Sequence, residues 1–313
     1  MRHLNQTPLS SRIVKMKDIV LITGANGHLA KVVSQHLSKD YSVRFLTTQK
    51  RMISRNSYFH WDIQKKYIDY KALENCKHII HLAGFPVLKK WTSKNKKIMY
   101  NSRIESTKLI FDACKKMNIR PATFISASAI GIYDQSLEGH VHEDSPKGKD
   151  WLAKMACDWE GVASKFKEIG SRVVQMRISL IFSKKAGFLK YNLLSMRFGI
   201  GAIVGNANRK LNWMHVKDIA RFVKESINNK TYNGPYNLAC EDKKSQEKFI
   251  KGIKKNLFPY AIIVKIPIFI IRFFLGERSQ IINTDLSLDT NKIKNQGFKC
   301  KINTLEQMLE IKK

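Results

Sequence analysis

The sequence predicts an α/β fold in which a doubly wound parallel sheet is followed by a smaller C-terminal lobe. Three observations lead to this prediction. Apolar runs of strand length alternate with amphipathic segments of helical period up to about residue 183. A glycine turn joins the first apolar run, Ile19–Thr23, to the first amphipathic segment. Beyond residue 183 the alternation becomes irregular, which indicates a change of architecture.

The apolar runs are typical of a parallel sheet, because helices cover both faces of such a sheet and its strands are buried. Each predicted helix carries the chain back to the start of the next strand. The predicted strands are Ile19–Thr23, Ser42–Thr47 and residues 78–83, 123–126 and 172–179, and the predicted helices are residues 31–37, 95–117 and 151–169.

The same pattern divides the chain into three regions. We expect residues 1–16 to be a short tail or a misplaced start, because Met16 closely precedes the first strand, with an organellar transit signal as the weaker alternative. Residues 17–182 form the sheet domain. Residues 183–313 form mainly a C-terminal substrate lobe, with some segments returning to the sheet. In such folds ligands enter at the carboxyl ends of the strands.

The charge is the unusual feature of the composition. The 313 residues carry a net charge of +31, but the lysines are scattered in pairs and no block of five like charges occurs. Abundant Ile, Asn and Lys are typical of an AT-rich genome. We therefore expect no specific nucleic-acid partner, with generic polyanion binding as a weaker alternative.

The cysteines and the hydropathy pattern bear on location. Five cysteines, at 76, 114, 157, 240 and 300, show neither a CxxC pair nor zinc-ligand spacing, so we expect no metal site and a reducing, cytoplasmic environment. Residues 258–276 are apolar over the length of a membrane span, but Lys265, Pro267 and Arg272 interrupt them. We expect a packed segment there and no membrane span, with interfacial contact as the alternative.

The glycine turn reads Gly24-Ala-Asn-Gly-His-Leu-Ala, a GxxGxxA spacing. Gly24 permits a tight turn, Gly27 lets the backbone approach a pyrophosphate at the helix N-terminus, and Ala30 allows close packing of helix on strand. The motif follows a strand and opens a helix, which is the context that dinucleotide binding requires. This predicts a Rossmann-type nucleotide-binding domain.

The residues after the second strand bear on which dinucleotide is bound. A carboxylate at this place would bind the ribose hydroxyls of NAD. The chain has Thr48, Gln49, Lys50 and Arg51 instead, and the two cations suit the 2′-phosphate of NADP. We therefore expect NADP(H) as the cofactor.

Several motifs in order resemble the extended short-chain dehydrogenase/reductase superfamily, and more closely its atypical "epimerase family protein" subfamily. They include TGxxGxxA, "WDI" from residue 61, "HLAG" from residue 81, "SASAIGIY" from residue 126 and "LNWMHVKDIA" from residue 211. The resemblance extends from about residue 17 to the C-terminus. It implies a Rossmann-type domain, a small C-terminal lobe and NADP binding. The cofactor residues it implies, beyond Thr48, Lys50 and Arg51, are Gly24, Asn26, Gly27, His28, Leu29, Asp62, Ile63, Leu82, Ala83, Gly84 and Ser126.

The superfamily's proton relay is missing. The resemblance implies a serine that orients the substrate oxygen, matched by Ser128 or, less well, Ser126. It also implies a YxxxK element in the helix near residues 151–160. If Glu160 is aligned with the superfamily's helix glutamate, Leu152 replaces the tyrosine and Ala156 replaces the lysine. This departure is typical of the subfamily.

Two residues are candidate substitute donors. Tyr133 follows Ser128 near the end of a strand, so its hydroxyl could face the cleft. His215 is the other, and Asp218 would either fix its tautomer or cap the following helix. Arg177 would bind a phosphate or carboxylate, or form a salt bridge at the edge of the core. A structural role is the alternative for each.

The leading hypothesis is an NADP(H)-dependent, epimerase-like oxidoreductase that transfers a hydride to or from an unidentified small organic substrate. The catalytic candidates are Ser128, Tyr133 and His215. The alternative is a non-catalytic NADP(H)-binding sensor that binds a partner, as the family's link to cell division suggests. The resemblance also implies a possible homodimer formed through helices such as 95–117 and 151–169.

Overall fold

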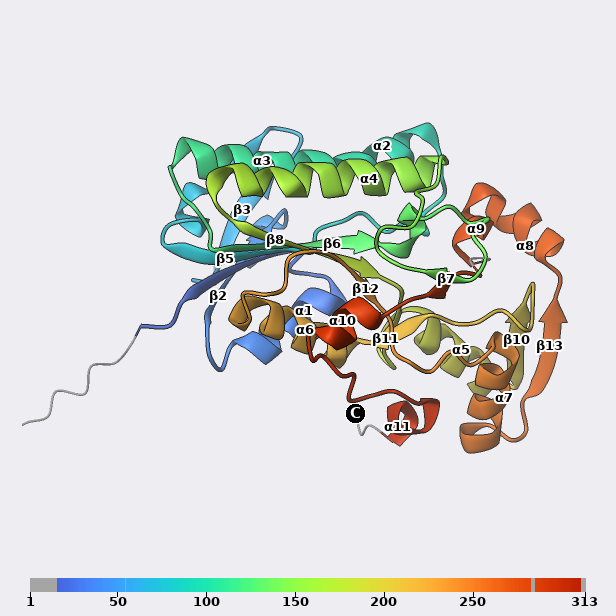
Figure 1. The fold of residues 1–313 in the computed structure, drawn as a ribbon. Coiled ribbons are helices and arrows are strands. Elements are labelled where there is room, and N and C mark those ends of the chain that lie inside the picture. Colours follow the sequence, from blue (N-terminus) through green and yellow to red (C-terminus); the bar gives the residue numbers. More distant parts are fainter. Residues whose placement is uncertain (1–15, 54, 283–284, 311–313) are drawn as a thin grey trace, which may run out of the picture.

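The fold centres on an eight-stranded sheet with the order β12-β8-β6-β5-β1-β2-β3-β4 (Figure 1). A computed structural model describes residues 16–53, 55–282 and 285–310; the predicted tail, apart from Met16, lies outside these residues. All pairings in the sheet are parallel except that of β4 with β3. The strands are β1 (Ile19–Thr23), β2 (Ser42–Thr47), β3 (Tyr58–Asp62), β4 (Tyr67–Ile68), β5 (Cys76–His81), β6 (Thr123–Ala129), β8 (Arg172–Ile178) and β12 (Gly234–Leu238). The predicted α/β class is confirmed.

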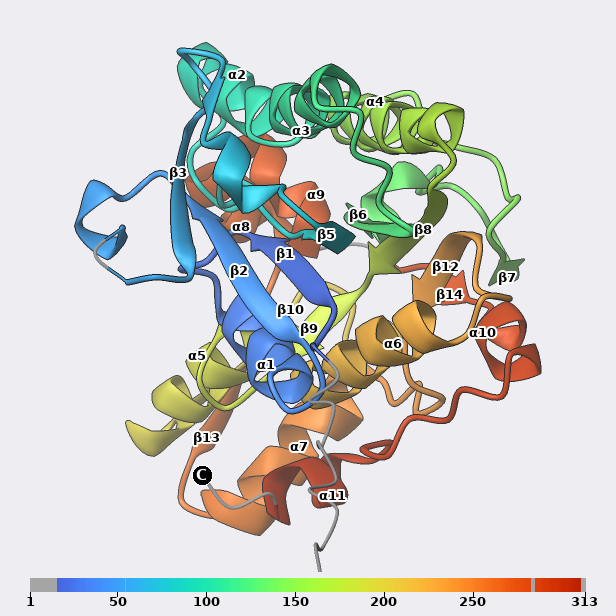
Figure 2. The ribbon, with the colours of Figure 1, turned by 90° about the vertical axis from the view of Figure 1, so that its left-hand side faces the viewer.

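Helices cover both faces of this sheet, as the apolar strands require (Figures 1 and 2). One layer contains α2 (Ser93–Asn101), α3 (Ile104–Lys116) and α4 (Trp151–Ser164), and the other contains α1 (His28–Leu37), α6 (Val216–Asn228) and α10 (Asn291–Asn295). Val20, Leu21 and Ile22 of the central strand β1 have no exposed surface, because side chains on both of its faces meet a helical layer.

Two helices differ from their predicted bounds. The single helix expected over residues 95–117 is wrong, because the chain breaks between α2 and α3 at Ser102 and Arg103. The Ser102 hydroxyl donates to the Met99 carbonyl and accepts the Phe85 amide, local bonds that compete with continuous helix. The helix predicted over 151–169 ends at Ser164 and continues as a 3₁₀ turn, η4 (Lys165–Ile169).

A second group of elements lies beyond residue 183 with its own apolar core. Phe182 stacks on Trp213 with ring centroids 4.8 Å apart, and Met196, Phe249 and Ile250 pack around them. Its larger elements are α5 (Gly187–Arg197), β10 (Ile200–Val204), α7 (Gln246–Leu257), β13 (Ile262–Ile266) and α8 (Ile268–Leu275). Short elements are η1 (Lys50–Met52), η2 (Tyr70–Ala72), η3 (Ile130–Ile132), β7 (His140–Val141), β9 (Leu180–Phe182), β11 (Trp213–His215), η5 (Gly276–Arg278), α9 (Ser279–Ile282), β14 (Ser287–Leu288) and α11 (Leu305–Glu310).

The apolar stretch 258–276 is divided between β13 and α8, and Pro267 separates the two. No helix within the described ranges has both the length and the apolar character needed to cross a bilayer. The same residues contain no cluster of three or more His, Cys, Asp or Glu side chains suited to a metal ion.

A buried hydrogen-bond chain joins the carboxyl ends of β1 and β5. Thr23 Oγ1 accepts the amides of Leu82 and Ala83 and lies 2.9 Å from His81 Nδ1. His81 Nε2 lies 3.1 Å from Ser106 Oγ, which itself donates to the Ser102 carbonyl. These bonds assign the His81 proton to Nε2, because Nδ1 must accept the Thr23 hydroxyl. Burial lowers the pKa of His81 to about 3, so the ring is neutral.

We predict that this arrangement makes the fold sensitive to mild acid. The folded-state pKa of His81, and those of His78 and His215 at about 4, lie below the ordinary 6.5, so the unfolded chain takes up protons first. The stabilisation is complete above pH 6.5 and is lost as pH falls towards 4. Each histidine contributes a slope of up to about 1.4 kcal/mol per pH unit. Denaturant unfolding measures the free energy of unfolding of wild type and His81→Gln at neutral pH and in mild acid. This free energy should fall less between the two pH values in the variant than in wild type, and equal falls would contradict the prediction.

Candidate cofactor and substrate site

The glycine turn lies against the end of β5, where the order of the strands reverses. Gly24 adopts a φ of +74°, and a Cβ there would come within 2.9 Å of the Leu82 carbonyl oxygen. The Gly27 amide donates to the Gly24 carbonyl at 2.7 Å and closes the turn. The turn is thus held by Leu82 and Ala83, two of the predicted cofactor residues, at the switch point where α/β folds bind ligands.

The N-terminus of α1 has the properties of an anion site. Gly27 is its N-cap, without a side chain to accept a backbone amide, and the first turn contains no acidic residue. Asn26 and Gly27 are exposed, and His28 and Leu29 are partly exposed, so an anion can approach the unpaired amides. The positive end of the helix dipole favours a phosphate at this place.

The predicted adenosine end is built by the loops after β2 and β3. Lys50 and Arg51 lie in the exposed 3₁₀ turn η1, and Thr48 before them is also exposed. Asp62 ends β3, and its Oδ1 accepts the amides of Gln64 and Lys65 at 3.0 and 3.1 Å. One oxygen of the Asp62 carboxylate therefore accepts bonds from its own loop. The segment directly after β2 offers cations and no carboxylate.

Ser128 belongs to a buried polar network centred on an ion pair. Arg177 and Glu160 form two parallel bonds, Nε to Oε1 and Nη2 to Oε2, each 2.8 Å long. Ser128 Oγ donates to the same Glu160 Oε1 at 2.7 Å. Ser128 on β6 and Arg177 on β8 are register partners, and Glu160 reaches them from α4. Of the two roles expected for Arg177, the structure shows the salt bridge.

Tyr133 is part of this network, and the expectation that its hydroxyl faces an open cleft is wrong. The hydroxyl donates to Asn237 Oδ1 at 2.6 Å and accepts Arg177 Nη1 at 2.9 Å. The side chain has no exposed surface, and burial raises the pKa of Tyr133 to about 12, against the lowering effect of Arg177. Sequence reasoning missed Asn237, whose backbone amide donates to the Glu143 carboxylate, because it comes from a distant segment.

His215 lies outside the Ser128 network and caps α6. Its Nδ1 accepts the Lys217 amide at 3.3 Å, which places the ring proton on Nε2. Asp218 performs neither of the expected tasks: it accepts bonds from Arg221 and from the amides of Lys301 and Ile302. Burial lowers the pKa of His215 to about 4. The structure thus brings Ser128 and Tyr133 together, and leaves His215 on β11.

His28 connects the glycine turn to the second group of elements. His28 Nε2 lies 2.8 Å from Ser183 Oγ, one residue beyond the end of β9. β9 pairs in parallel with β11, which ends at His215. Burial lowers the pKa of His28, and the charges of Lys185 and Lys31 lower it further. The first residue of α1 is therefore held by the segment that leaves the sheet.

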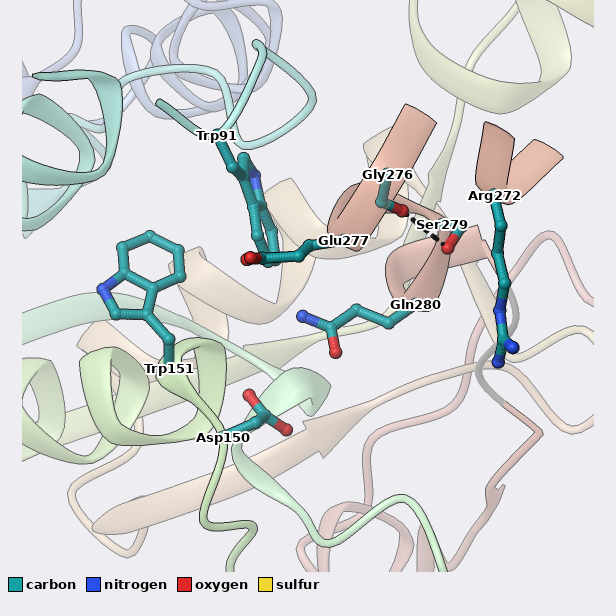
Figure 3. A pocket seen from close by; sticks show the side chains of 8 residues that line it. All are labelled: Trp91, Asp150, Trp151, Arg272, Gly276, Glu277, Ser279 and Gln280. Atoms are coloured by element: carbon teal, nitrogen blue, oxygen red, sulfur yellow. Dashed lines mark hydrogen bonds between the residues drawn. The ribbon is translucent and has the colours of Figure 1, made fainter. Parts of the chain in front are cut away.

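A pocket of about 520 Å³ opens between the start of α4 and the turn after α8 (Figure 3). The Trp91 and Trp151 rings lie on one side, with centroids 5.1 Å apart and an interplanar angle of 62°. Lys96 Nζ lies 5.5 and 5.4 Å from the two ring centroids and pairs with Glu277. The remaining lining residues are Asp150, Arg272, Gly276, Ser279 and Gln280. This pocket was not predicted from the sequence.

The helix face beside the pocket, where the YxxxK element is expected, is apolar and packed. Leu152 lies so close to Gly131 that a Cβ on the glycine would come within 2.9 Å of Leu152 Cδ2. Ala156 is buried against Ile132 and Tyr133. The two positions therefore attach α4 to the turn after β6 and supply no titratable group.

Comparison with known proteins finds relatives along most of the chain. The model of the NAD dependent epimerase/dehydratase family matches residues 20–239. An epimerase family protein of Staphylococcus aureus strain MRSA252 is 29% identical over 304 residues, covering 93% of this chain and 97% of that protein.

Two solved structures share the fold. One is a human epimerase family protein (isoform 2), crystallised with NADPH, which superimposes with a TM-score of 0.81 at 19% sequence identity. The match covers 93% of this chain and 98% of the human chain. A UDP-N-acetylglucosamine 4-epimerase from Methanobrevibacter ruminantium M1, in complex with UDP-N-acetylmuramic acid, has a TM-score of 0.74 at 19% identity, with coverages of 94% and 96%.

We predict that Gly24→Ala destabilises the protein more than Gly139→Ala does. Both glycines have a φ near +75°, at +74° and +76°, so both substitutions carry the left-handed penalty of about 1 kcal/mol. Only at Gly24 would the added Cβ meet a backbone carbonyl; at Gly139 nothing lies within 4 Å. Thermal unfolding of both variants tests this, and equal losses would show that the turn can move away from Leu82.

We also predict that Arg177→Met lowers the unfolding free energy by about 3–5 kcal/mol, because it leaves the buried Glu160 carboxylate without its partner. The matched control is Lys77→Met, which breaks the exposed Lys77–Asp18 pair at 2.8 Å and should cost no more than about 1 kcal/mol. Denaturant unfolding measures both. Similar costs would mean that the buried pair is not a main support of the fold.

Proposed function

Because the chain belongs to the NAD dependent epimerase/dehydratase family, we propose that it is an NADP(H)-dependent oxidoreductase acting by hydride transfer on a small organic substrate. The observation that carries the proposal is the uncapped, acid-free N-terminus of α1 beside the Gly24 turn. This arrangement would hold the pyrophosphate of a dinucleotide. When bound, the nicotinamide supplies or accepts the hydride.

The remaining cofactor contacts are proposed from placement. Leu82, Ala83 and Gly84 would line the cofactor where β5 ends, with Ser126 on the neighbouring β6 and Asp62 and Ile63 near the adenine. Lys50 and Arg51 support NADP(H) over NAD(H), because an exposed cation pair suits a 2′-phosphate. The human relative crystallised with NADPH is consistent with this choice.

The substrate would occupy the pocket between Trp91, Trp151 and the turn after α8, and would have to extend from there to the buried Ser128, which is not among the lining residues. Ser128 would orient the reacting oxygen, with Glu160 fixing the direction of its hydroxyl. Tyr133 and His215 stay the proposed proton donors. For Tyr133 this role requires its hydroxyl to exchange Asn237 for the substrate. For His215 the neutral ring can donate only a hydrogen bond from Nε2 to the substrate oxygen, and transfer of a proton requires the ring to be protonated first.

A second candidate function is a non-catalytic NADP(H) sensor that binds a partner. The observation that favours it is the packed apolar face of α4, where Leu152 and Ala156 stand in place of the relay. Under this proposal the cofactor is bound and never turned over. Cofactor-dependent partner capture without oxidation of NADPH, across carbonyl, enone and imine substrates, would favour the sensor over the oxidoreductase.

We predict that the protein binds NADPH at least about tenfold more tightly than NADH, and that Lys50→Glu/Arg51→Glu removes this preference. NADH affinity should change little, because NADH has no 2′-phosphate. The control is Lys115→Glu/Lys116→Glu at the end of α3, which makes the same change in charge. Calorimetric titration of wild type and both variants with NADPH and NADH measures the six affinities. Equal losses in both variants would indicate general electrostatics, and no binding of either dinucleotide would refute the proposed function.

A further inference from the structure

The small sheet formed by β10 and β13 has an outer face that no element of the described chain covers. The two strands pair in parallel, with Ile200 opposite Ile262, Ala202 opposite Val264 and Val204 opposite Ile266. Since side chains alternate between the faces of a strand, these six apolar residues share one side. The other side is the packed one: it carries Gly201 and Ile203, and a Cβ on Gly201 would contact Met196 and Ile250.

The helix that follows is also apolar and uncovered. α8 has the sequence IFIIRFFL and contains no buried residue. Its Phe269, Phe273 and Phe274 side chains are 68%, 85% and 72% exposed. β10, β13 and α8 lie at one end of the molecule, remote from β2 (Figure 1). Exposed phenylalanines in such number are typical of an interaction surface.

We call this set the lobe surface: Ile200, Ile262, Val264, Phe269, Phe273 and Phe274. The segments that carry it have a large excess of cations, although Lys251 and Lys265 both pair with Glu247. Residues 187–205 and 246–276 contain one carboxylate, Glu247, against eight cations, which are Lys190, Arg197, Lys248, Lys251, Lys254, Lys255, Lys265 and Arg272. Glu277, directly after this range, pairs with Lys96 at the pocket.

This charge distinguishes between the possible occupants of the lobe surface. A second copy of the chain would bring a further excess of cations against the first, in a protein whose net charge is already +31. A layer of lipid phosphates would neutralise the same cations while its acyl region receives the phenyl rings. Basic rims around exposed aromatic side chains are the pattern of proteins that lie in a membrane interface.

We propose that the lobe surface adsorbs to the surface of a bilayer that contains anionic phospholipid. α8 lies in the plane of the interface, since eight residues are too few to span it. Its phenylalanines enter the boundary between headgroups and acyl chains, and the surrounding lysines and arginines contact phosphate. Arg272 and Gly276 also line the substrate pocket, so the adsorbed helix lies beside the pocket. The proposal is independent of the proposed oxidoreductase activity.

The test is flotation of the full chain with vesicles of phosphatidylcholine, alone or mixed with phosphatidylglycerol. We expect binding to the mixed vesicles, at least about tenfold weaker binding to phosphatidylcholine alone, and weakening by salt. Phe269→Ser/Phe273→Ser/Phe274→Ser should lose most of the binding. The matched control, Tyr67→Ser/Tyr70→Ser/Leu88→Ser, removes three exposed apolar side chains elsewhere and should bind as wild type does.

Circular dichroism and NADPH titration check that both variants fold, which is expected because the phenylalanines contribute little to the core. Three outcomes would overturn the proposal. The first is that wild type floats with neither vesicle. The second is that the two triple variants bind equally, which would attribute the binding to the net charge of the chain. The third is a dimer, seen by sedimentation without lipid, that the phenylalanine substitutions alone dissociate; this would make the lobe surface a subunit interface.

Discussion

The Glu160–Arg177 ion pair is the interaction on which the rest of the structure depends. It joins α4 to β8 across the buried face of the sheet. Each of the two charges loses its hydration on burial, and the attraction of the opposite charge is the main compensation for that loss. Ser128 and Tyr133 take their positions from its two ends. Arg177 also donates to the Glu143 carbonyl, so the same guanidinium holds the loop that precedes α4. One pair of charges therefore arranges the central strands, the first helical layer and the candidate chemistry.

The part of the site proposed to bind the dinucleotide and the part proposed to react with the substrate are built differently. The turn between β1 and α1 keeps small residues and free amides, which suits an anionic ligand. The face of α4 is apolar at Leu152 and Ala156 and packs on its neighbours. Dinucleotide binding and proton transfer are thus physically separable in this fold. Membership of the epimerase/dehydratase family therefore supports dinucleotide binding more strongly than it supports proton transfer.

Local patterns in the sequence predict the local parts of this structure. Apolar runs predict the buried strands, and the glycine spacing predicts the turn before α1. What sequence cannot show is where a polar side chain finds its partner. Tyr133 meets Asn237, 104 residues away, which turns its hydroxyl inward. The pocket likewise combines Trp91, Trp151 and residues 276–280, which no periodicity relates. The proposed roles of the cofactor and catalytic residues stay predictions.

The hydrogen-bond chain from Leu82 to Ser102 has a direction. Each hydroxyl and the one ring proton donates forward, and the two amides at its start cannot reverse. Turning the imidazole over would leave the Thr23 and Ser106 hydroxyls each facing a ring carbon, and all three side chains are fully buried. The loop after β5 therefore has a single arrangement before any ligand arrives. The entropic cost of ordering this loop is met during folding. A dinucleotide bound there, as proposed, would therefore meet a surface that already has its final shape.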